Sequence, residues 1–206
     1  MDNVQILMKT EDRIVATALT LFNERGIEYV GLRELAVILD VHVGNITYYF
    51  PTKDDLVFRL ANDLGKLNSD LFSADATITL AFYLDQLERM MRNQLKYKSL
   101  FLSFVHLMKN NPKLAAAYKK TERSRLTGHK QHLLTLAKNK ELTFKSDSDI
   151  DNLTSTLSLI LRFWISEAQI SLKTFSEEEQ VRHYLKIISA LLIPYTTVKG
   201  RKELKV

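Results

Sequence analysis

The feature that most constrains the fold of this chain is how rarely its helical pattern is interrupted. Only three prolines and six glycines occur in 206 residues. Apolar residues recur at spacings of three and four along nearly the whole length, as one face of an α-helix requires. Hydrophobic residues make up 46% of the chain and charged residues 26%, a balance typical of a globular protein with a full core. We therefore expect an all-α fold of about nine helices.

Several classes of protein are excluded by what the sequence lacks. The longest apolar runs, over 157–165 and 187–193, are much shorter than the roughly 18 to 20 residues that span a membrane. The first residues show no export signal, so we expect a cytoplasmic protein. There are no cysteines, which excludes disulfides, thiol nucleophiles and cysteine-ligated zinc.

The charge of the chain is unevenly distributed. The net charge of +5 and the pI near 9.3 point to a nucleic-acid partner. Residues 1–64, however, contain six Lys/Arg and ten Asp/Glu, a net −4, whereas residues 89–145 contain fourteen and two, a net +12. We interpret the basic stretch as a solvated helix face, with nucleic acid or an acidic ligand as the alternatives. Net charge alone therefore does not locate a binding site.

Capping residues mark the ends of the expected helices. Thr10 is expected to be the N-cap of the first helix, which Gly26 ends. Thr52 precedes the fourth helix, which runs towards Phe72, and Ser176 begins the last. The nine helices are expected over about 11–25, 31–39, 43–49, 53–72, Thr77 to Tyr97, 100–110, 112–138, 149–173 and 177–197.

Two short helices joined by a three-residue turn are expected within residues 31–50. Their apolar residues can pack the pair against the first helix, and the segment 43–49 then presents its other side chains outward. A recognition helix presents side chains to the major groove of DNA in this way. The sequence predicts a helix-turn-helix DNA-binding domain over 1–55 and a larger helical domain over 56–206. The apolar residues of the pair are Leu35, Ala36, Leu39, Val41, Ile46 and Phe50.

Residues 10–64 resemble the DNA-binding heads of the tetracycline-repressor (TetR) family. The motifs align without a gap, which makes the resemblance specific. The chain departs from the family where Gly31, Asp40, His42 and Thr47 stand in place of the usual Thr or Ser, Gly, Ser and Tyr. Asp40 is tolerable in the turn because Asp enters the left-handed region more readily than most residues. The matching residues are Leu35-Ala36, Val41, Gly44-Asn45-Ile46, Tyr49-Phe50, Lys53 and Leu56.

The resemblance implies that the second and third helices contact DNA. It assigns Arg33 as a base or phosphate contact, although Arg33 could instead pair with a surface acid. It assigns Asn45, Thr47 and Tyr48 as groove contacts. Arginine suits guanine and asparagine suits adenine, so the residue types agree with these roles. The complete expected set is Arg33, His42, Val43, Gly44, Asn45, Thr47, Tyr48, Tyr49 and Lys53.

The remaining members of this set have other roles. Gly44 permits close approach of the backbone to DNA, and Tyr49 with Lys53 can hold phosphates beside the start of the fourth helix. His42 is either a phosphate donor or a helix cap. Either Tyr48 or Tyr49 could pack the head instead. The operator sequence is therefore expected to differ from those of better-known relatives.

The last two helices are expected to form a homodimer interface. Their apolar faces are wider than one partner needs, and the resemblance implies a four-helix bundle with a second copy. A dimer would place two recognition helices on half-sites about 34 Å apart, so the partner is a pseudo-palindromic double-stranded operator. The interface residues are expected to be Leu157, Leu161, Trp164, Tyr184, Ile188 and Leu191.

Aromatic residues and methionines of the larger domain could line a pocket for an unidentified small-molecule effector. The same residues at helical spacing could be ordinary core. No cofactor or metal is expected, because His106, His129 and His132 lack nearby acids that would complete a metal site. The candidate pocket residues are Phe82, Met90, Phe101, Phe104, Met108, Tyr118 and Phe163.

The function expected from these features is a ligand-responsive dimeric repressor. A DNA-binding adaptor, or an activator without a small-molecule ligand, is the alternative. An enzyme is not supported, because the sequence shows no Ser/His/Asp spacing, phosphate loop or paired-carboxylate motif.

Overall fold

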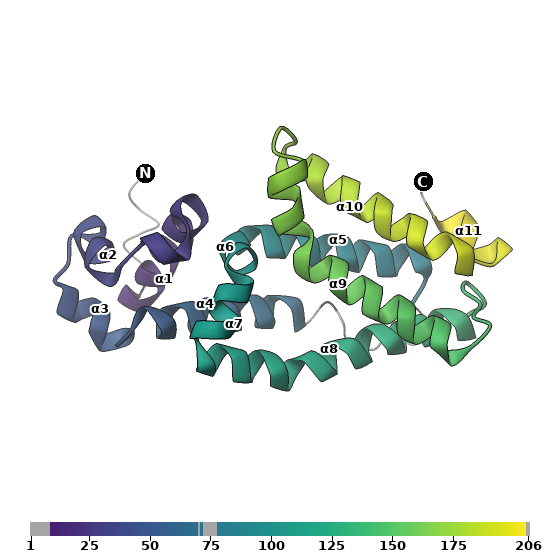
Figure 1. Cartoon of the computed structure of the whole chain (residues 1–206), viewed down its shortest axis with the longest axis horizontal. Helices are drawn as coiled ribbons and strands as arrows, with labels where there is room; N and C mark the ends of the chain where they lie inside the picture. Colours follow the sequence, from purple (N-terminus) through teal and green to yellow (C-terminus); the bar gives the residue numbers. More distant parts are fainter. Residues whose placement is uncertain (1–8, 70, 72–77, 205–206) are drawn as a thin grey trace. The chain divides into compact units, whose positions relative to one another are not determined.

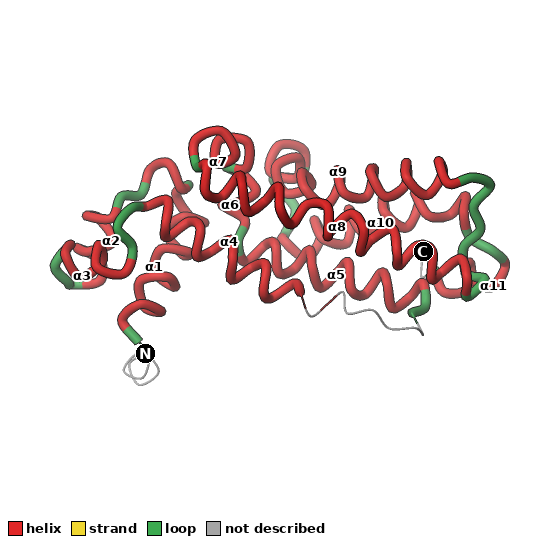
Figure 2. The backbone as a smooth tube through the Cα atoms, turned by 90° about the horizontal axis from the view of Figure 1, so that it is seen from below, coloured by secondary structure: helices red, strands yellow, loops and turns green. Residues whose placement is uncertain are grey.

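The computed structural model describes residues 9–69, 71 and 78–204, which form helices joined by short loops (Figures 1 and 2). The all-α expectation is confirmed: within the described residues the only β feature is an isolated bridge between Leu142 and Thr196. The elements are α1 Thr10–Arg25, η2 Ile27–Tyr29, α2 Leu32–Leu39, α3 Val43–Tyr49, α4 Lys53–Ser69, α5 Leu80–Lys96, α6 Lys98–Leu102, α7 Phe104–Asn110, α8 Pro112–Lys138, α9 Asp147–Ser171, α10 Glu177–Leu192, η4 Ile193–Tyr195 and α11 Val198–Glu203.

The described residues contain two α-helices more than the expected nine. The segment 100–110 is divided at the buried Ser103 into α6 and α7, and a short helix, α11, follows α10. The predicted last helix stops at Leu192 and tightens into the 3-10 helix η4, because Pro194 has no backbone N–H to continue the α-helical hydrogen bonds.

The start of the first helix also differs from the expectation. Thr10 is the first helical residue, and Lys9, whose side chain makes no capping bond, stands at the N-cap. Phe72 and Thr77, the expected end of the fourth helix and start of the fifth, lie outside the described residues.

The described chain divides into two compact units. One contains the residues up to Lys66 together with Tyr97–Ala116, and the other contains Leu67–Lys96 together with the residues from Ala117 onward. The first unit therefore joins the helix-turn-helix segment to α6, α7 and the start of α8.

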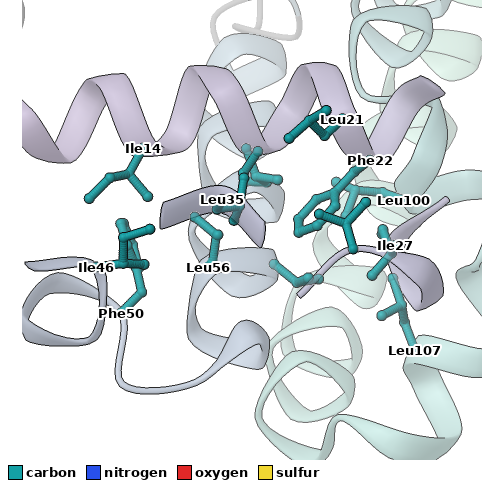
Figure 3. Packing of buried hydrophobic residues seen from close by; sticks show 14 of the residues in the cluster. Ile14, Leu21, Phe22, Ile27, Leu35, Ile46, Phe50, Leu56, Leu100 and Leu107 are labelled. Carbon is teal, nitrogen blue, oxygen red and sulfur yellow. The ribbon is translucent and has the colours of Figure 1, made fainter. Parts of the chain in front are cut away.

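The first unit has one apolar core (Figure 3). The apolar stripe of α1 is buried, and Leu35 of α2, Ile46 of α3 and Leu56 of α4 are fully buried beside it. Leu100 of α6 and Leu107 of α7 join the same cluster. Burial of large aliphatic side chains of this kind contributes about 1.5–3 kcal/mol each, so this core fixes α2 and α3 against α1. The buried stripe of α1 is Ile14, Ala18, Leu21 and Phe22.

The second unit is built around α5, α9 and α10, which lie side by side (Figure 1). Trp164 of α9 is 1% exposed, and its Nε1–H donates to Gln94 Oε1 at 2.6 Å. The amide of Gln94 in turn donates to the carbonyl oxygen of Leu161 at 3.1 Å. These bonds satisfy polar groups that would be costly to bury alone. They hold α5 and α9 in a fixed position relative to each other.

The capping residue predicted for the last helix, Ser176, is confirmed. Ser176 and Glu179 form a reciprocal capping box at the start of α10. Asn111 Oδ1 accepts the backbone N–H of Leu114 at 2.8 Å, with Pro112 as the first residue of α8. No described helix is long and apolar enough to cross a membrane.

Candidate nucleic-acid interface

The turn between α2 and α3 sets the angle between these two helices of the head (residues 10–64). Asp40 has φ 52° and ψ 50°, a left-handed conformation that ends α2. The backbone N–H of Val41 then donates to the carbonyl oxygen of Ala36 at 3.0 Å. The sequence expectation for Asp40 is confirmed, and the turn brings α3 out of line with α2 while Ile46 stays buried.

The outer face of α3 consists of polar and aromatic side chains. Ile46 is buried and Val43 is half-buried, so the helix is anchored by its inner face. Tyr48 is 81% exposed, and its ring meets the ring of Tyr49 edge-on with centroids 5.0 Å apart. Tyr29 on η2 is equally exposed, so the exposure of one ring does not identify a partner surface; α3 differs in that its exposed residues, interrupted only by Ile46, follow one another along one short helix. The exposed residues of this face are Gly44, Asn45, Thr47, Tyr48 and Tyr49.

His42 is the N-cap of α3. Its Nδ1 accepts the backbone N–H of Gly44 at 3.2 Å. A nitrogen that accepts a hydrogen bond carries no proton, so in the neutral ring the proton is on Nε2. The ring is exposed, and this Nε2–H can donate to a second acceptor. The two roles that the sequence left open for His42, helix cap and phosphate donor, are therefore compatible with each other.

Gly44 and Thr47 fit closely around this cap. A Cβ at Gly44 would lie 3.2 Å from His42 Nδ1, tighter than ordinary van der Waals contact. The hydroxyl of Thr47 donates to the carbonyl oxygens of Val43 and Gly44 at 3.4 and 3.3 Å. Its proton is engaged by the backbone, which leaves the oxygen as an acceptor and the methyl group as an apolar contact.

The two cations of the predicted site have different surroundings. Arg33 is exposed in the first turn of α2, and no acid among the described residues pairs with it. The neighbouring acid Glu34 is engaged by Arg25 at 2.5 Å. Lys53, in contrast, donates its ammonium to the carbonyl oxygens of Ile27 and Glu28. Arg33 is thus available to a phosphate or a base, and Lys53 is already bonded.

Some of the acids of the head are paired with a cation of the head. Arg59 on α4 forms ion pairs with Glu11, Asp12 and Asp63. These acids lie on α1 and α4 and not on α2 or α3. The helix α3 itself contains no acidic residue, so the negative net charge of the segment does not lie on α3.

The residues expected at the dimer interface lie in the core of the second unit. Five of the six are no more than 6% exposed within the single chain, and only Leu191 is half-buried. The exposed apolar residues of the same two helices are Leu159 and Ile170 on α9 and Ile187 on α10. Helical spacing predicted apolar faces wider than one partner needs, but not which part of each face packs inside the protomer. The five buried residues are Leu157, Leu161, Trp164, Tyr184 and Ile188.

The candidate pocket residues are not brought together in one compact unit. Phe101 and Met108 pack against the core of the head, and Phe104 belongs to the same unit. In the second unit Met90 is buried, whereas Phe82 is 44% exposed. Tyr118 lies under the guanidinium of Arg125, 4.3 Å from its ring centroid, and Phe163 is half-buried.

Two histidines of α8 belong to a buried polar cluster. His129 Nδ1 lies 3.3 Å from the hydroxyl of Tyr83, and the ring of His132 lies 5.8 Å from that of Tyr83. Burial lowers the pKa of His129 to about 4, so the ring is neutral at pH 7. Among the described residues no group of three or more His, Asp and Glu could hold a metal ion.

Sequence reasoning did not identify the polar contacts that join the head to α6 and α7. Asn23 Oδ1 accepts the backbone N–H of Ser99 at 3.0 Å, and Ser103 bonds to the carboxylate of Glu28. No local signal reveals such pairs, because their partners lie about 75 residues apart.

Two family models match the chain. The model described as "Bacterial regulatory proteins, tetR family" matches residues 14–60, and the TetR model described as "Bacterial transcriptional repressor" matches residues 68–204. The first contains the helix-turn-helix segment described above, and the second covers α5 to α11.

Curated and solved relatives agree with these matches. A Bacillus subtilis (strain 168) protein, "Probable HTH-type transcriptional regulator YttP", is 30% identical over 92 residues, which are 44% of this chain and 44% of the relative's length. A TetR-family regulator of Marinobacter aquaeolei VT8 is 22% identical with a TM-score of 0.86, covering 95% of both chains. A protein of Saccharomonospora viridis in complex with choline is 23% identical with a TM-score of 0.66, covering 86% of this chain and 94% of that one.

The matched segments together span both the helix-turn-helix segment and the helical body. They support a regulator of transcription and not an enzyme, and they imply DNA binding by the head. The chain belongs to the TetR family of bacterial transcriptional regulators.

Proposed function

We propose that this chain is a homodimeric repressor that reads a pseudo-palindromic double-stranded operator with α3 and releases it when a small molecule binds the body. The observation that carries the proposal is the division of α3 into a buried face at Ile46 and an outer face of exposed polar and aromatic residues. An α-helix fits the major groove of B-DNA, and its exposed side chains then reach base edges.

The residue types of this surface suit DNA at each position. Asn45 can pair with adenine, and Arg33 can pair with guanine or a phosphate. Tyr48 and Tyr49 can donate their hydroxyls to phosphates, and His42 can donate from Nε2. Affinity then depends on a few well-placed donors, because the head as a whole is acidic.

The test removes two exposed side chains that make no stabilising contact with the head core. Arg33→Ala combined with Tyr48→Ala should abolish the binding of a DNA duplex selected by the wild type, in a gel-shift assay at moderate salt. Tyr29→Ala is the matched control, because Tyr29 is 81% exposed like Tyr48 but lies on η2. Equal affinities of the double variant and the control would refute the assignment of α3 and Arg33 to DNA.

The dimer interface is proposed to lie on the exposed apolar stripes of α9 and α10. Leu159, Phe163 and Ile170 recur on one face of α9, and Ile187 and Leu191 on one face of α10. A second copy of the chain would remove these side chains from water and form a four-helix bundle.

The oligomeric state tests this interface. Leu159→Arg combined with Ile187→Arg should give a monomer by light scattering at micromolar concentration, because two cations per protomer would have to be buried. Val198→Arg, at a position that is 82% exposed on α11, is the control and should leave the dimer intact. A dimeric double variant, or a monomeric wild type, would exclude this interface.

The proposed effector site lies within the helical body. The Tyr184 hydroxyl and Gln86 Oε1 are buried without a hydrogen-bond partner among the described residues. Buried polar groups are nearly always satisfied, so these two support a ligand with hydrogen-bonding groups. The choline complex of the Saccharomonospora protein makes choline the first compound to test.

Thermal unfolding and DNA release together test the effector. A ligand at about 100 times its Kd should stabilise the free protein by roughly 2.7 kcal/mol and should lower DNA affinity by linkage. A compound that raises Tm without weakening DNA binding would bind the protein but would not be an inducer. If a broad panel of compounds has no effect while DNA binding persists, the alternative of an adaptor or activator without a ligand is favoured.

A further inference from the structure

Lys53 connects three segments of the first unit. It is the first residue of α4, and its half-buried ammonium donates to the carbonyl oxygens of Ile27 at 2.9 Å and Glu28 at 3.3 Å. Both carbonyls belong to η2, the 3-10 helix between α1 and α2. Two of the three N–H groups of the ammonium are therefore bonded within the protein.

The carboxylate of Glu28 extends this connection to the joint between α6 and α7. The buried Ser103 at that joint donates to the Glu28 side chain. Burial raises the pKa of Glu28, but the bond from Ser103 and the attraction of His106 and Lys53 outweigh it, so the pKa is lowered. The ionised carboxylate and the ammonium thus stabilise the same turn.

The residues after Lys53 are held by the start of α8. Lys113 forms an ion pair with Asp55 at 2.9 Å, and its ammonium lies 4.6 Å from the ring centroid of Phe58. Asn111 donates to the carbonyl oxygen of Asp54. The first turn of α4 is therefore fixed on one side by η2 and on the other by α8.

The recognition helix ends directly before this turn. The last residue of α3 is Tyr49, and only Phe50, Pro51 and Thr52 separate it from Lys53. A displacement of the start of α4 would thus reach α3 through three residues. Phe50, the first of these three residues, is buried in the head core, so the connection is anchored at the end of α3.

We propose that Lys53 is a positioning residue: it holds the recognition helix at the angle needed for the major groove by bonding η2, and it is not a phosphate contact. The inference rests on the proposed function for the role of α3 in DNA binding. The part of the proposal that concerns structure, namely that Lys53 orders α3, applies to the protein without DNA. While the bonds to the Ile27 and Glu28 carbonyls persist, only the third N–H of the ammonium is left for any other acceptor.

Amide hydrogen exchange of the free protein tests whether Lys53 orders α3. Lys53→Met keeps the length of the side chain and removes its donors, and it should speed exchange in residues 43–50 about tenfold while α1 and α9 stay unchanged. Lys53→Arg keeps a donor and should restore most of the protection. Arg33→Gln, which removes a cation without a partner among the described residues, should leave exchange unchanged. Unchanged exchange in Lys53→Met would overturn the proposal.

The salt dependence of DNA affinity separates positioning from phosphate contact. Affinities are measured for a DNA duplex of about 30 base pairs selected from a random pool by the wild type. For a phosphate contact, the slope of log affinity against log salt falls by about 0.9 per protomer. For a positioning residue, Lys53→Met lowers affinity about tenfold at every salt concentration and keeps the slope. Arg33→Gln gives the slope change expected for the loss of a DNA contact, and Lys138→Met gives the slope change for the loss of a charge in the second unit.

Each outcome bears on a different claim. A reduced slope in Lys53→Met would overturn the proposal and identify Lys53 as a phosphate contact. Faster exchange in a protein that binds no duplex would refute the DNA-binding function but keep the ordering role of Lys53. If Lys53→Met and the milder Lys53→Gln both unfold as a whole, Lys53 serves global stability, and the proposal is likewise overturned.

Discussion

Replacing His42 by Ser and by Ala separates its helix cap from its proposed contact with DNA. In the structure Nδ1 accepts the Gly44 N–H at 3.2 Å, and the rest of the ring is exposed. Serine is among the best N-cap residues, so His42→Ser keeps the cap but is too short to replace the Nε2–H donor. His42→Ala removes both. The two variants should therefore differ from each other in stability, because only His42→Ser keeps the cap. Both should differ from the wild type in DNA affinity, because both lack the Nε2–H donor.

The expected magnitudes follow from these bonds. Loss of an N-cap costs about 0.5–2 kcal/mol, so His42→Ala should be about 1 kcal/mol less stable than His42→Ser. Loss of one hydrogen bond to a phosphate costs about 1 kcal/mol per protomer. In a dimer that is about 2 kcal/mol, or roughly a thirtyfold weaker Kd for His42→Ser.

Urea unfolding measures the first quantity, and fluorescence anisotropy with a labelled duplex measures the second. If His42→Ser binds DNA as tightly as the wild type, the exposed nitrogen makes no contact and His42 is a cap only. If His42→Ala unfolds at the same urea concentration as His42→Ser, the bond to Gly44 contributes nothing to stability. Either result would refute that part of the reasoning.

Three further substitutions test the turn, the body core and a buried histidine. Asp40→Gly should stabilise the head by about 0.5–1 kcal/mol in urea unfolding, because glycine adopts φ 52° without strain; Asp40→Ala keeps the strain and should not stabilise. Gln94→Leu should destabilise the protein by about 2–4 kcal/mol, because it leaves the buried Trp164 N–H without an acceptor; equal stability would exclude this bond as a stabilising contact. Burial lowers the pKa of His129 to about 4 from 6.5, so the unfolded state takes up a proton first and stability falls by roughly 3 kcal/mol between pH 6.5 and 4. His129→Gln should flatten this decline, and the exposed His106→Gln should not; a decline unchanged in His129→Gln would contradict the assignment.

Single residues with strong backbone preferences predicted the helix ends at which they lie. The end of α2 and the start of α8 were predicted correctly, because Asp40 and Pro112 set those two boundaries by their own backbone preferences. The break at Ser103 could not be predicted, since Ser103 is placed by the packing of α6 and α7 and by its bond to Glu28. Pro194 did carry a signal for the end of α10, and its missing N–H accounts for the early stop.

Helical periodicity identified the apolar faces of α9 and α10 but not their partners. Leu157 and Leu159 are both leucines of α9, yet the first is fully buried and the second is 61% exposed. A stripe that packs inside a protomer and one that could meet a second copy have the same 3.6-residue period. Only the packed structure distinguishes them, because the distinction depends on which elements reach each face.

The separate surroundings of Arg33 and Lys53 determine how this head can recognise DNA. Of the six Lys/Arg in residues 1–64, Arg25 and Arg59 pair with acids and Lys53 bonds to η2. Few cations remain for phosphates, so generic attraction to DNA should be weak and the salt slope shallow. A larger share of operator affinity must then come from base contacts such as the one proposed for Asn45. Non-operator DNA should therefore compete poorly with the operator, even at low salt where generic binding is strongest.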